Sequence, residues 1–330
     1  MSQEITKIKS FDLMKMLLAY FVIADHCDIR YEYPLLFNVI KMAVPLFFLM
    51  SGYLLWHRLS TLPHSEWGGY FTKYIRHILK IYIVWSLIYL PFAIYDAILR
   101  DESFVKYSFI VLRGWLFEGL NWMSWHLWYL LALIIATYFI KVLLNHNLKI
   151  ELIFLISVIV TLFGVLLMDI KPFITNLTES HYLILKFYYL IFKHTRNGLF
   201  TGLGYVSLGM LLCKYRGYLN RYRNIFLVTI MIFSFIGVCW DFPLSQHLLA
   251  SIVIILAIRG NFSLRRYDNY IRSLSLLVYL IHMIFVAIVS IYYPNLMFID
   301  KLIIVSTLST FISVILLAIN KRYHILAMFI

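Results

Sequence analysis

The 330-residue chain is 62% apolar and 18% aromatic, and only 14% of its residues are charged. Soluble domains are about half apolar and a quarter charged, so this composition excludes a soluble fold. Apolar runs of roughly 20 residues, the length that crosses a ~30 Å hydrocarbon core, recur from end to end. The net charge of +13 comes from basic residues in the short segments between these runs. There they set topology or meet anionic membrane lipid, so we expect no nucleic-acid partner.

Ten apolar segments are predicted to cross the membrane as helices, because backbone polar groups in lipid must be paired within their own segment. The alternating strands of a membrane barrel are absent from the sequence. The predicted spans are about 11–27, 36–56, 77–99, 124–144, 150–168, 198–213, 225–240, 244–258, 271–291 and 301–319. No connection between them is long enough for a soluble domain. Residues 1–330 are therefore expected to form one all-α transmembrane domain, a single bundle of about ten helices.

The distribution of basic residues predicts the orientation. With the N-terminus inside, 18 of the 29 lysines and arginines fall on the cytoplasmic side and ten on the other. By the positive-inside rule, both termini are cytoplasmic and loop 169–197 is extracytoplasmic. The N-terminus runs into the first span without a small-residue cleavage site, so we expect a retained helix rather than a signal peptide. Cys27, Cys213 and Cys239 show no metal-ligand spacing, and we expect no metal site.

The first span carries four ionisable residues, which are functional candidates because unpaired charges in lipid are costly. Lys15 and His26 are eleven residues apart, so they share a helix face and lie about 16 Å apart along the axis. A single ligand that uses both must be long. Asp12 lies three residues before Lys15, close enough for the two to pair, and Asp25 adjoins His26. Alternatively, Lys15 extends to the interface and His26 caps the outer end of the helix.

A basic stripe enters the third span, because Lys73, Arg76 and Lys80 fall at positions i, i+3 and i+7. Such a stripe can bind phosphates through charge-assisted hydrogen bonds. The alternative is an ordinary positive-inside flank.

Polar residues also interrupt later spans. Ser51 lies within VPLFFLMSGYLL at 44–55, where a small residue can simply allow close helix packing. His126 lies between Trp125 and Trp128 at a predicted outer interface, where tryptophans are common but histidines are not.

Two further segments complete the set. Arg196 and Asn197 precede a Gly198-xxx-Gly202 pattern that favours close helix packing. Tyr279 and His282 share one face of the ninth predicted span, which is typical of a proton-handling or ligand-binding pair and equally of a structural hydrogen bond.

In order, these segments resemble the membrane-bound acyltransferase family 3, whose members O-acetylate bacterial surface glycans. The resemblance rests on the Lys15-to-His26 spacing, FFLMSGY, the basic stripe, SWHLWYL, TRNGLF…GML and LVYLIH, which together span residues 11–282. In that family a cationic residue and a histidine on the first span are essential. Arginine is usual at the first of these positions, and Lys15 keeps the charge but lacks the bidentate fork.

The TRNGLF and HLWYL segments are also similar to the membrane domain of vancomycin-resistance serine racemases. That domain is associated with serine uptake and is followed there by a racemase domain. Because the chain ends shortly after the last predicted span, we expect neither a racemase domain nor an esterase-like periplasmic domain.

The resemblance implies a multi-pass acyltransferase of the bacterial inner membrane. It would transfer an acyl group, typically acetyl, from cytoplasmic acetyl-CoA to a hydroxyl of a surface glycan or its lipid-linked precursor. The stripe would bind the nucleotide, Lys15 would serve the donor end, and His26 would be the general base or a transient acyl carrier, oriented by Asp25. The residues expected on the acceptor side are Ser51, His126, Arg196, Asn197, Tyr279 and His282.

Two rival functions remain open from the sequence. A transporter or sensor for a small polar solute such as serine explains the polar spans equally well but gives the basic stripe no role. An inactive scaffold is the third reading.

Overall fold

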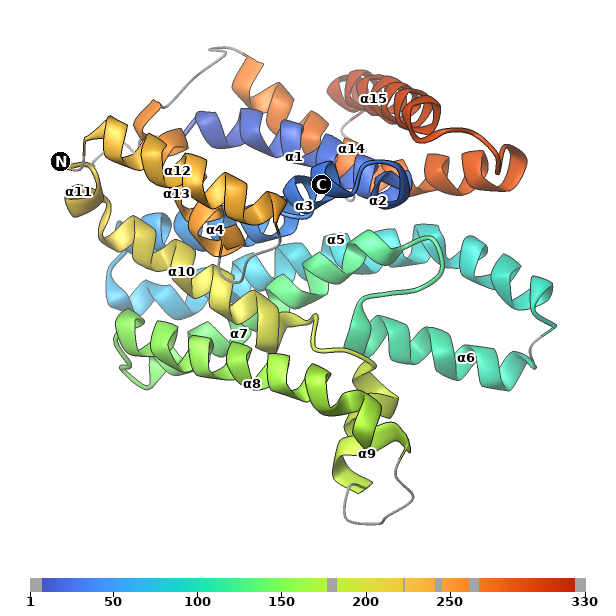
Figure 1. Ribbon diagram of the computed structural model, residues 1–330, viewed down its shortest axis with the longest axis horizontal. Coiled ribbons are helices and arrows are strands. Elements are labelled where there is room, and N and C mark those ends of the chain that lie inside the picture. Colours follow the sequence, from blue (N-terminus) through green and yellow to red (C-terminus); the bar gives the residue numbers. More distant parts are fainter. Residues whose placement is uncertain are drawn as a thin grey trace. The chain divides into compact units, whose positions relative to one another are not determined.

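The computed structural model describes residues 8–101, 103–176, 183–221, 223–240, 245–260 and 267–323. Within these ranges every regular element is a helix and none is a strand, as Figure 1 shows. The all-helical prediction is therefore confirmed for the described part of the chain. The helices fall into two compact units, which we call the terminal unit (Met1–Pro63 with Gly209–Ile330) and the central unit (His64–Leu208).

The terminal unit contains the first and the last helices of the chain. They are α1 (Ser10–His26), α2 (Ile29–Glu32), α3 (Pro34–Ile40), α4 (Ala43–Leu59), the end of α10 (Leu203–Lys214), α11 (Arg216–Leu219), α12 (Asn224–Cys239), α13 (Ser245–Gly260), α14 (Asp268–Tyr292) and α15 (Phe298–Tyr323). Helix α1 contains neither glycine nor proline and ends where Asp28 turns into the left-handed region at φ 73°.

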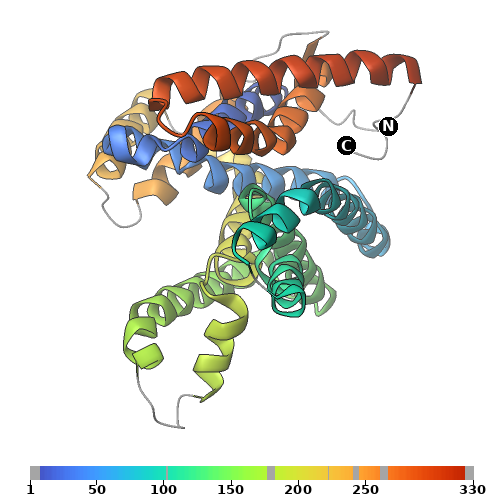
Figure 2. The ribbon, with the colours of Figure 1, turned by 90° about the vertical axis from the view of Figure 1, so that its right-hand side faces the viewer.

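The core of the terminal unit is built around α1 and α14, which pack side by side (Figures 1 and 2). Leu18, Ala19 and Val22 of α1 and Val278 of α14 are buried. Helix α10 also approaches α4 closely, because a Cβ at Gly209 would lie 2.2 Å from the carbonyl oxygen of Leu49. The packing of α1 on α14 fixes the relative positions of the polar residues that these two helices carry.

The central unit contains the remaining helices. They are α5 (His64–Leu99), α6 (Phe104–Arg113), the π-helix η1 (Gly114–Glu118), the short 3-10 helix η2 (Trp125–Leu127), α7 (Trp128–Asn145), α8 (Ile150–Asn176), α9 (Leu183–Phe192), the π-helix η4 (Gly198–Gly202) and the start of α10. With 36 residues, α5 is about 54 Å long and exceeds a ~30 Å hydrocarbon core. Its two ends can therefore lie at opposite membrane surfaces.

Six described helical segments are long and apolar enough to cross a membrane. They are Pro34–Leu59, His64–Leu99, Trp125–Asn145, Ile150–Pro172, Asp268–Tyr292 and Phe298–Arg322. In Phe298–Arg322 only 17% of the apolar window is buried, which leaves a broad apolar surface for lipid. The chain is thus a multi-pass membrane protein. A total of ten spans remains a prediction, as does the cytoplasmic side of the termini, whose last residues lie outside the described ranges.

Two predicted spans differ in their details. Span 36–56 is interrupted after Ile40, where the amide of Lys41 bonds to the carbonyl at i−4 but that of Met42 bonds to the carbonyl at i−3. This switch tightens the backbone and separates α3 from α4. Helix α5 begins at His64, well before the predicted boundary at 77, so the basic stripe lies within the helix rather than at its edge.

The prediction of a loop at 169–197 was wrong in part. Helix α8 extends to Asn176 and α9 covers Leu183–Phe192, while 177–182 lie outside the described residues. Ten residues of helix reach only about 15 Å, so a search for membrane-length apolar runs passes over α9. The side of the membrane on which this segment lies stays a prediction.

Candidate functional site

A pair of histidines lies at the centre of the candidate site in the terminal unit. His26 is the last residue of α1, and its ring stacks on that of His282 from α14, with centroids 5.5 Å apart and planes at 28°. His282 is fully buried, whereas His26 is partly exposed. Imidazoles exchange protons near neutral pH, so an accessible ring supported by a buried one is suited to acid–base chemistry.

The buried ring has a defined orientation. Nδ1 of His282 lies 2.7 Å from the carbonyl oxygen of Tyr279, one turn earlier on α14. A carbonyl can only accept a hydrogen bond, so Nδ1 carries the proton and the lone pair of the neutral ring is on Nε2. The predicted Tyr279–His282 pair is therefore joined through the tyrosine backbone, while the two rings lie 6.1 Å apart in a tilted contact.

Helix α4 adds a wall to this region. The ring of Phe47 lies 5.8 Å from that of Tyr279. Ser51 follows Phe47 by one helical turn and therefore lies on the same side of α4. Ser51 is partly exposed. The terminal unit thus brings together His26, Tyr279 and His282 where α14 packs on α1, while Ser51 lies on the side of α4 that carries Phe47.

Asp25 is placed differently from the expectation that it orients His26. Its side chain is exposed, and the carboxylate makes no hydrogen bond or ion pair within the described residues. Neighbouring residues on a helix point about 100° apart, which turns Asp25 away from the histidine. Asp25 lies instead one turn beyond Phe21, on another side of α1.

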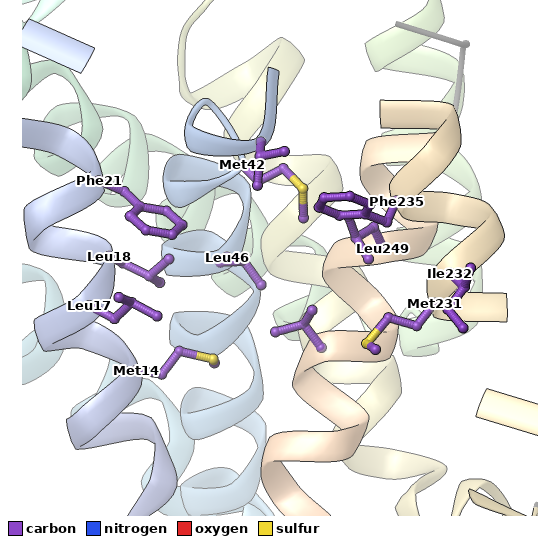
Figure 3. Close-up of a pocket in the computed structure, with 12 residues that line it drawn as sticks. Met14, Leu17, Leu18, Phe21, Met42, Leu46, Met231, Ile232, Phe235 and Leu249 are labelled. Carbon is purple, nitrogen blue, oxygen red and sulfur yellow. The ribbon is translucent and has the colours of Figure 1, made fainter. Parts of the chain in front are cut away.

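That side of α1 faces an apolar pocket of about 430 Å³ (Figure 3). Phe21 and Leu18 of α1 point into it from one side, and Phe235 of α12 and Leu249 of α13 from the other. Met14, Met42 and Met231 also line it, and methionine side chains adapt readily to irregular apolar partners. Phe21 points about 120–140° around the helix from Lys15 and His26, so α1 presents a polar side and a separate apolar side.

The N-terminal end of α1 carries a different ion pair from the one that the sequence suggested. Asp12 does not pair with Lys15 but accepts two hydrogen bonds from Arg272 of α14, from Nε at 2.8 Å and from Nη2 at 2.6 Å. Asp12 is only 3% exposed. The guanidinium group of an arginine can bind both oxygens of a carboxylate at once, which the ammonium group of a lysine does not do as well. This bidentate contact with Arg272 therefore replaces the Asp12–Lys15 pair.

Lys15 is consequently left without an ion pair among the described residues. It is partly buried on α1, where the charges of Asp12 and Arg272 both act on it. The single helix α1 confirms that Lys15 and His26 share a face, about 16 Å apart along the axis. Lys15 can therefore offer its charge to an anionic ligand.

The prediction that the basic stripe lies on a helix is confirmed by α5 of the central unit. Lys73, Arg76 and Lys80 are exposed along the first half of α5. Lys141 of α7 joins them, because its ammonium group donates a 2.9 Å hydrogen bond to Thr72 Oγ1, one turn from Arg76. Four cations at one end of the unit form a surface that suits phosphate groups.

His126 is buried in the central unit. Its ring is 2% exposed and meets the ring of Tyr89 edge-on, with centroids 5.3 Å apart. The neighbouring Trp125 is 38% exposed. A role for His126 in contacting an acceptor therefore remains a prediction, and its packing on Tyr89 also fits a structural role.

Arg196 and Asn197 both contact other residues of the central unit. The guanidinium carbon of Arg196 lies 4.8 Å from the ring centroid of Trp128. The side-chain oxygen of Asn197 accepts hydrogen bonds from the amides of Leu199 and Phe200 and so caps η4. The expected close packing at Gly198 is confirmed, since a Cβ there would lie 2.4 Å from the carbonyl oxygen of Ala132.

Two charged residues that form ion pairs in the structure were not identified from the sequence. Arg272 counted only as a topology signal, and nothing local indicates a partner 260 positions away. Glu118 is buried beside Arg113 in the central unit. An acid within the aromatic run GWLFEGL was a signal that could have identified it.

A family model described as an acyltransferase domain matches residues 8–319, nearly the whole chain. The chain belongs to this acyltransferase family. The family resemblance drawn from the ordered motifs is thereby confirmed. Together with the apolar helices, the match identifies a multi-pass membrane protein of this family.

The curated relatives of this chain carry names of another activity. A serine/alanine racemase of Enterococcus gallinarum is 29% identical over 146 residues, 42% of this chain and 20% of that protein. An amino-acid racemase of Enterococcus faecalis is 30% identical over 246 residues, 66% of this chain and 30% of that protein. The expected local similarity to racemases is confirmed, and the chain spans less than a third of these relatives' length. No solved structure matches the chain.

Proposed function

We propose that this membrane acyltransferase moves an acyl group, acetyl in the first instance, from acyl-coenzyme A to a hydroxyl of a cell-surface glycan or its lipid-linked precursor. The setting would be the bacterial inner membrane. The observation that carries the proposal is the stacked pair of His26 and His282 between two helices of an acyltransferase-family chain. An accessible imidazole that a buried imidazole supports is a suitable general base for a hydroxyl.

In this reaction His26 accepts the proton of the acceptor hydroxyl. The hydroxyl oxygen attacks the thioester carbonyl carbon and forms the new ester C–O bond. The C–S bond then breaks, and coenzyme A leaves as a thiolate that takes up the proton from His26. His282 acts as a positioning residue, because its hydrogen bond to the Tyr279 carbonyl holds the ring against which His26 stacks.

The donor is a long polyanion, and two sets of cations support its binding. Lys15 lies on the His26 face of α1 and forms no ion pair with any residue that the structure describes, since Arg272 occupies Asp12. In the central unit, Arg76 and its neighbours on α5 offer charge for phosphates. Each set is proposed on its own unit's geometry, and each is tested separately.

The apolar pocket on α1 supports a lipid-linked acceptor. Its walls are aliphatic, aromatic and thioether groups, which suit a hydrocarbon chain and no polar ligand (Figure 3). Leu17→Trp would fill part of this space, and Leu17 is 53% exposed, so the buried core of α1 is kept. It should slow transfer to a lipid-linked acceptor while leaving transfer to a short soluble acceptor unchanged.

The deciding test of the proposal is turnover per folded molecule for His26→Ala and His26→Gln. A general base contributes about 10²- to 10⁴-fold to rate, so both variants should lose that much acetyl transfer from radiolabelled acetyl-coenzyme A. Donor binding should persist, because the base acts on the acceptor. His146→Ala, which replaces an exposed histidine of the central unit, is the matched control. Near-native turnover in either His26 variant removes the catalytic assignment.

A second candidate function is the binding or transport of a small polar solute such as serine. It is supported by the names of two relatives, a serine/alanine racemase and an amino-acid racemase. Uptake of radiolabelled serine into vesicles, with no acetyl transfer, would favour this function over the first.

A further inference from the structure

A polar pocket of about 360 Å³ lies wholly within the central unit. It is lined by the end of α5, by α6 and η1, by the segment that leads into η2 and by the two residues after α9. Asp96 of its wall follows Arg76 of the basic stripe by 20 residues, so the two lie about 30 Å apart along α5. This distance equals the thickness of the hydrocarbon core. Because charged residues avoid that core, the stripe and the pocket lie at the head-group levels of opposite leaflets.

The charged side chains of the pocket leave an excess of positive charge. Its cations are Arg100, Arg113 and Lys193, and its carboxylates are Asp96 and Glu118. Asp96 accepts a 2.9 Å hydrogen bond from Arg100, and Glu118 lies 3.4 Å from Arg113. Each carboxylate is thus paired with an arginine, and no acid that the structure describes pairs with Lys193. The pocket therefore carries at least one cation whose charge is not offset.

Lys193 is held in place by its backbone. It directly follows α9 and adopts the left-handed region, with φ at 48°. This region is sparsely populated by residues other than glycine and recurs at ligand sites. The carbonyl oxygen of Lys193 accepts a hydrogen bond from the ammonium group of Lys171, which brings a fourth positive charge close to the pocket. The pocket therefore attracts an anion.

Two residues of the pocket offer buried polar atoms that the fold leaves unused. Glu118 is 7% exposed, and its Oε1 accepts no hydrogen bond from the described residues. Both ring nitrogens of His194 are buried, and neither has a hydrogen-bond partner among the same residues. Burial, with the Arg196 charge, lowers the pKa of His194 to about 4, so the neutral ring offers one donor and one acceptor at pH 7. These atoms suit hydroxyl groups, which both donate and accept.

The surroundings of the pocket favour a lipid over a soluble anion. Trp122 and Trp125 line the pocket, and tryptophan is enriched at the head-group level of membranes. Arg113 donates a 3.1 Å hydrogen bond to the carbonyl of Leu190 on α9, and the Leu190 side chain is exposed. Helix η1 packs on α9 and exposes Leu116. Exposed apolar side chains thus flank the cationic pocket, as the acyl chains of a lipid require.

We propose that this pocket binds the head group of an anionic glycerophospholipid of the phosphatidylglycerol type. Its phosphodiester carries one negative charge and pairs with Lys193, while its glycerol hydroxyls hydrogen-bond to Glu118 and His194. Its acyl chains lie on the exposed apolar surface of η1 and α9. A phosphatidylethanolamine head group has no net charge, and its ammonium group would meet the arginines and lysines. The proposal concerns lipid binding and does not rest on the acyl-transfer proposal.

The test is native mass spectrometry of the delipidated full-length protein in detergent, titrated with dioctanoyl phosphatidylglycerol and, separately, with dioctanoyl phosphatidylethanolamine. Phosphatidylglycerol should bind at least about 5-fold more tightly, the factor that one cation contributes at a membrane surface. Lys193→Gln should weaken phosphatidylglycerol binding about 5- to 10-fold, whereas Lys193→Arg keeps the charge and the affinity. His194→Phe keeps a ring without its nitrogens and should weaken binding about 2- to 12-fold. Lys149→Gln removes an exposed cation that does not line the pocket and should leave binding unchanged.

The outcomes separate a head-group site from other sources of binding. Equal affinity for the two lipids, or unchanged phosphatidylglycerol binding in Lys193→Gln, overturns the proposal and leaves only non-specific lipid around the helices. Glycerophosphoglycerol, the head group without acyl chains, is added as a competitor and should bind at least about 10-fold more weakly than the lipid. Competition at equal concentration would assign the pocket to a soluble phosphodiester and also overturn the proposal.

Two features keep the test independent of folding and of catalysis. Lys193 is exposed, so its replacement leaves the buried core intact. Phosphatidylglycerol binding should persist in His26→Ala, whatever happens to acetyl transfer, because the pocket and His26 belong to different units.

Discussion

Replacing Asp12 with asparagine should destabilise the packing of α1 on α14. Asp12 is 3% exposed and makes two short hydrogen bonds to Arg272. Removing one partner of a buried ion pair costs about 3–5 kcal/mol. The Arg272 side chain is 43% exposed and can turn toward solvent, which reduces that cost. We therefore expect Asp12→Asn to lower the free energy of unfolding by about 2–3 kcal/mol, as measured by denaturant unfolding in detergent.

A double-mutant cycle of Asp12→Asn with Arg272→Gln measures the pair itself. The coupling energy should exceed about 1 kcal/mol, and the same cycle with Lys15→Gln should give a smaller value. Asp25→Asn is the matched control, because this exposed carboxylate has no partner in the described part of the chain, and its effect should stay within about 0.5 kcal/mol. Coupling to Lys15 that equals or exceeds coupling to Arg272 would refute the reasoning and restore the local pair that the sequence suggested.

Three further predictions follow from the structure. Arg76→Ala and Lys80→Ala should raise the KM for acyl-coenzyme A about 10- to 150-fold, and an unchanged donor KM in both would leave the stripe as a topology signal. With the native cysteines removed, Tyr218→Cys should resist an impermeant maleimide added to intact cells while Phe104→Cys reacts, and the opposite result would invert the topology. The pKa of His194 falls from 6.5 to about 4 on folding, so its stabilising contribution is complete above pH 6.5 and disappears as the pH falls toward 4. That pH dependence should vanish in His194→Gln, whereas an identical pH slope in both proteins would contradict the assignment.

The sequence by itself determined the helical class, the family and the local geometry of α1. Hydropathy over roughly 20 residues predicts a membrane helix without reference to the rest of the chain. The shared face of Lys15 and His26 follows from the helical repeat alone, since both residues belong to one continuous helix. The family followed from short motifs in a fixed order, which the match over residues 8–319 confirmed. All of these properties depend on residues close together along the chain.

Only the tertiary structure decided which polar residues meet. The exchange of Lys15 for Arg272 as the partner of Asp12 depends on α14 packing against α1, across 260 positions of sequence. The same packing brings His282 onto His26 and turns Asp25 away. The burial of Glu118 likewise depends on segments that converge from separate helices. Burial and ion pairing are properties of the surfaces that come together when helices pack, whereas helix formation itself is set by neighbouring residues.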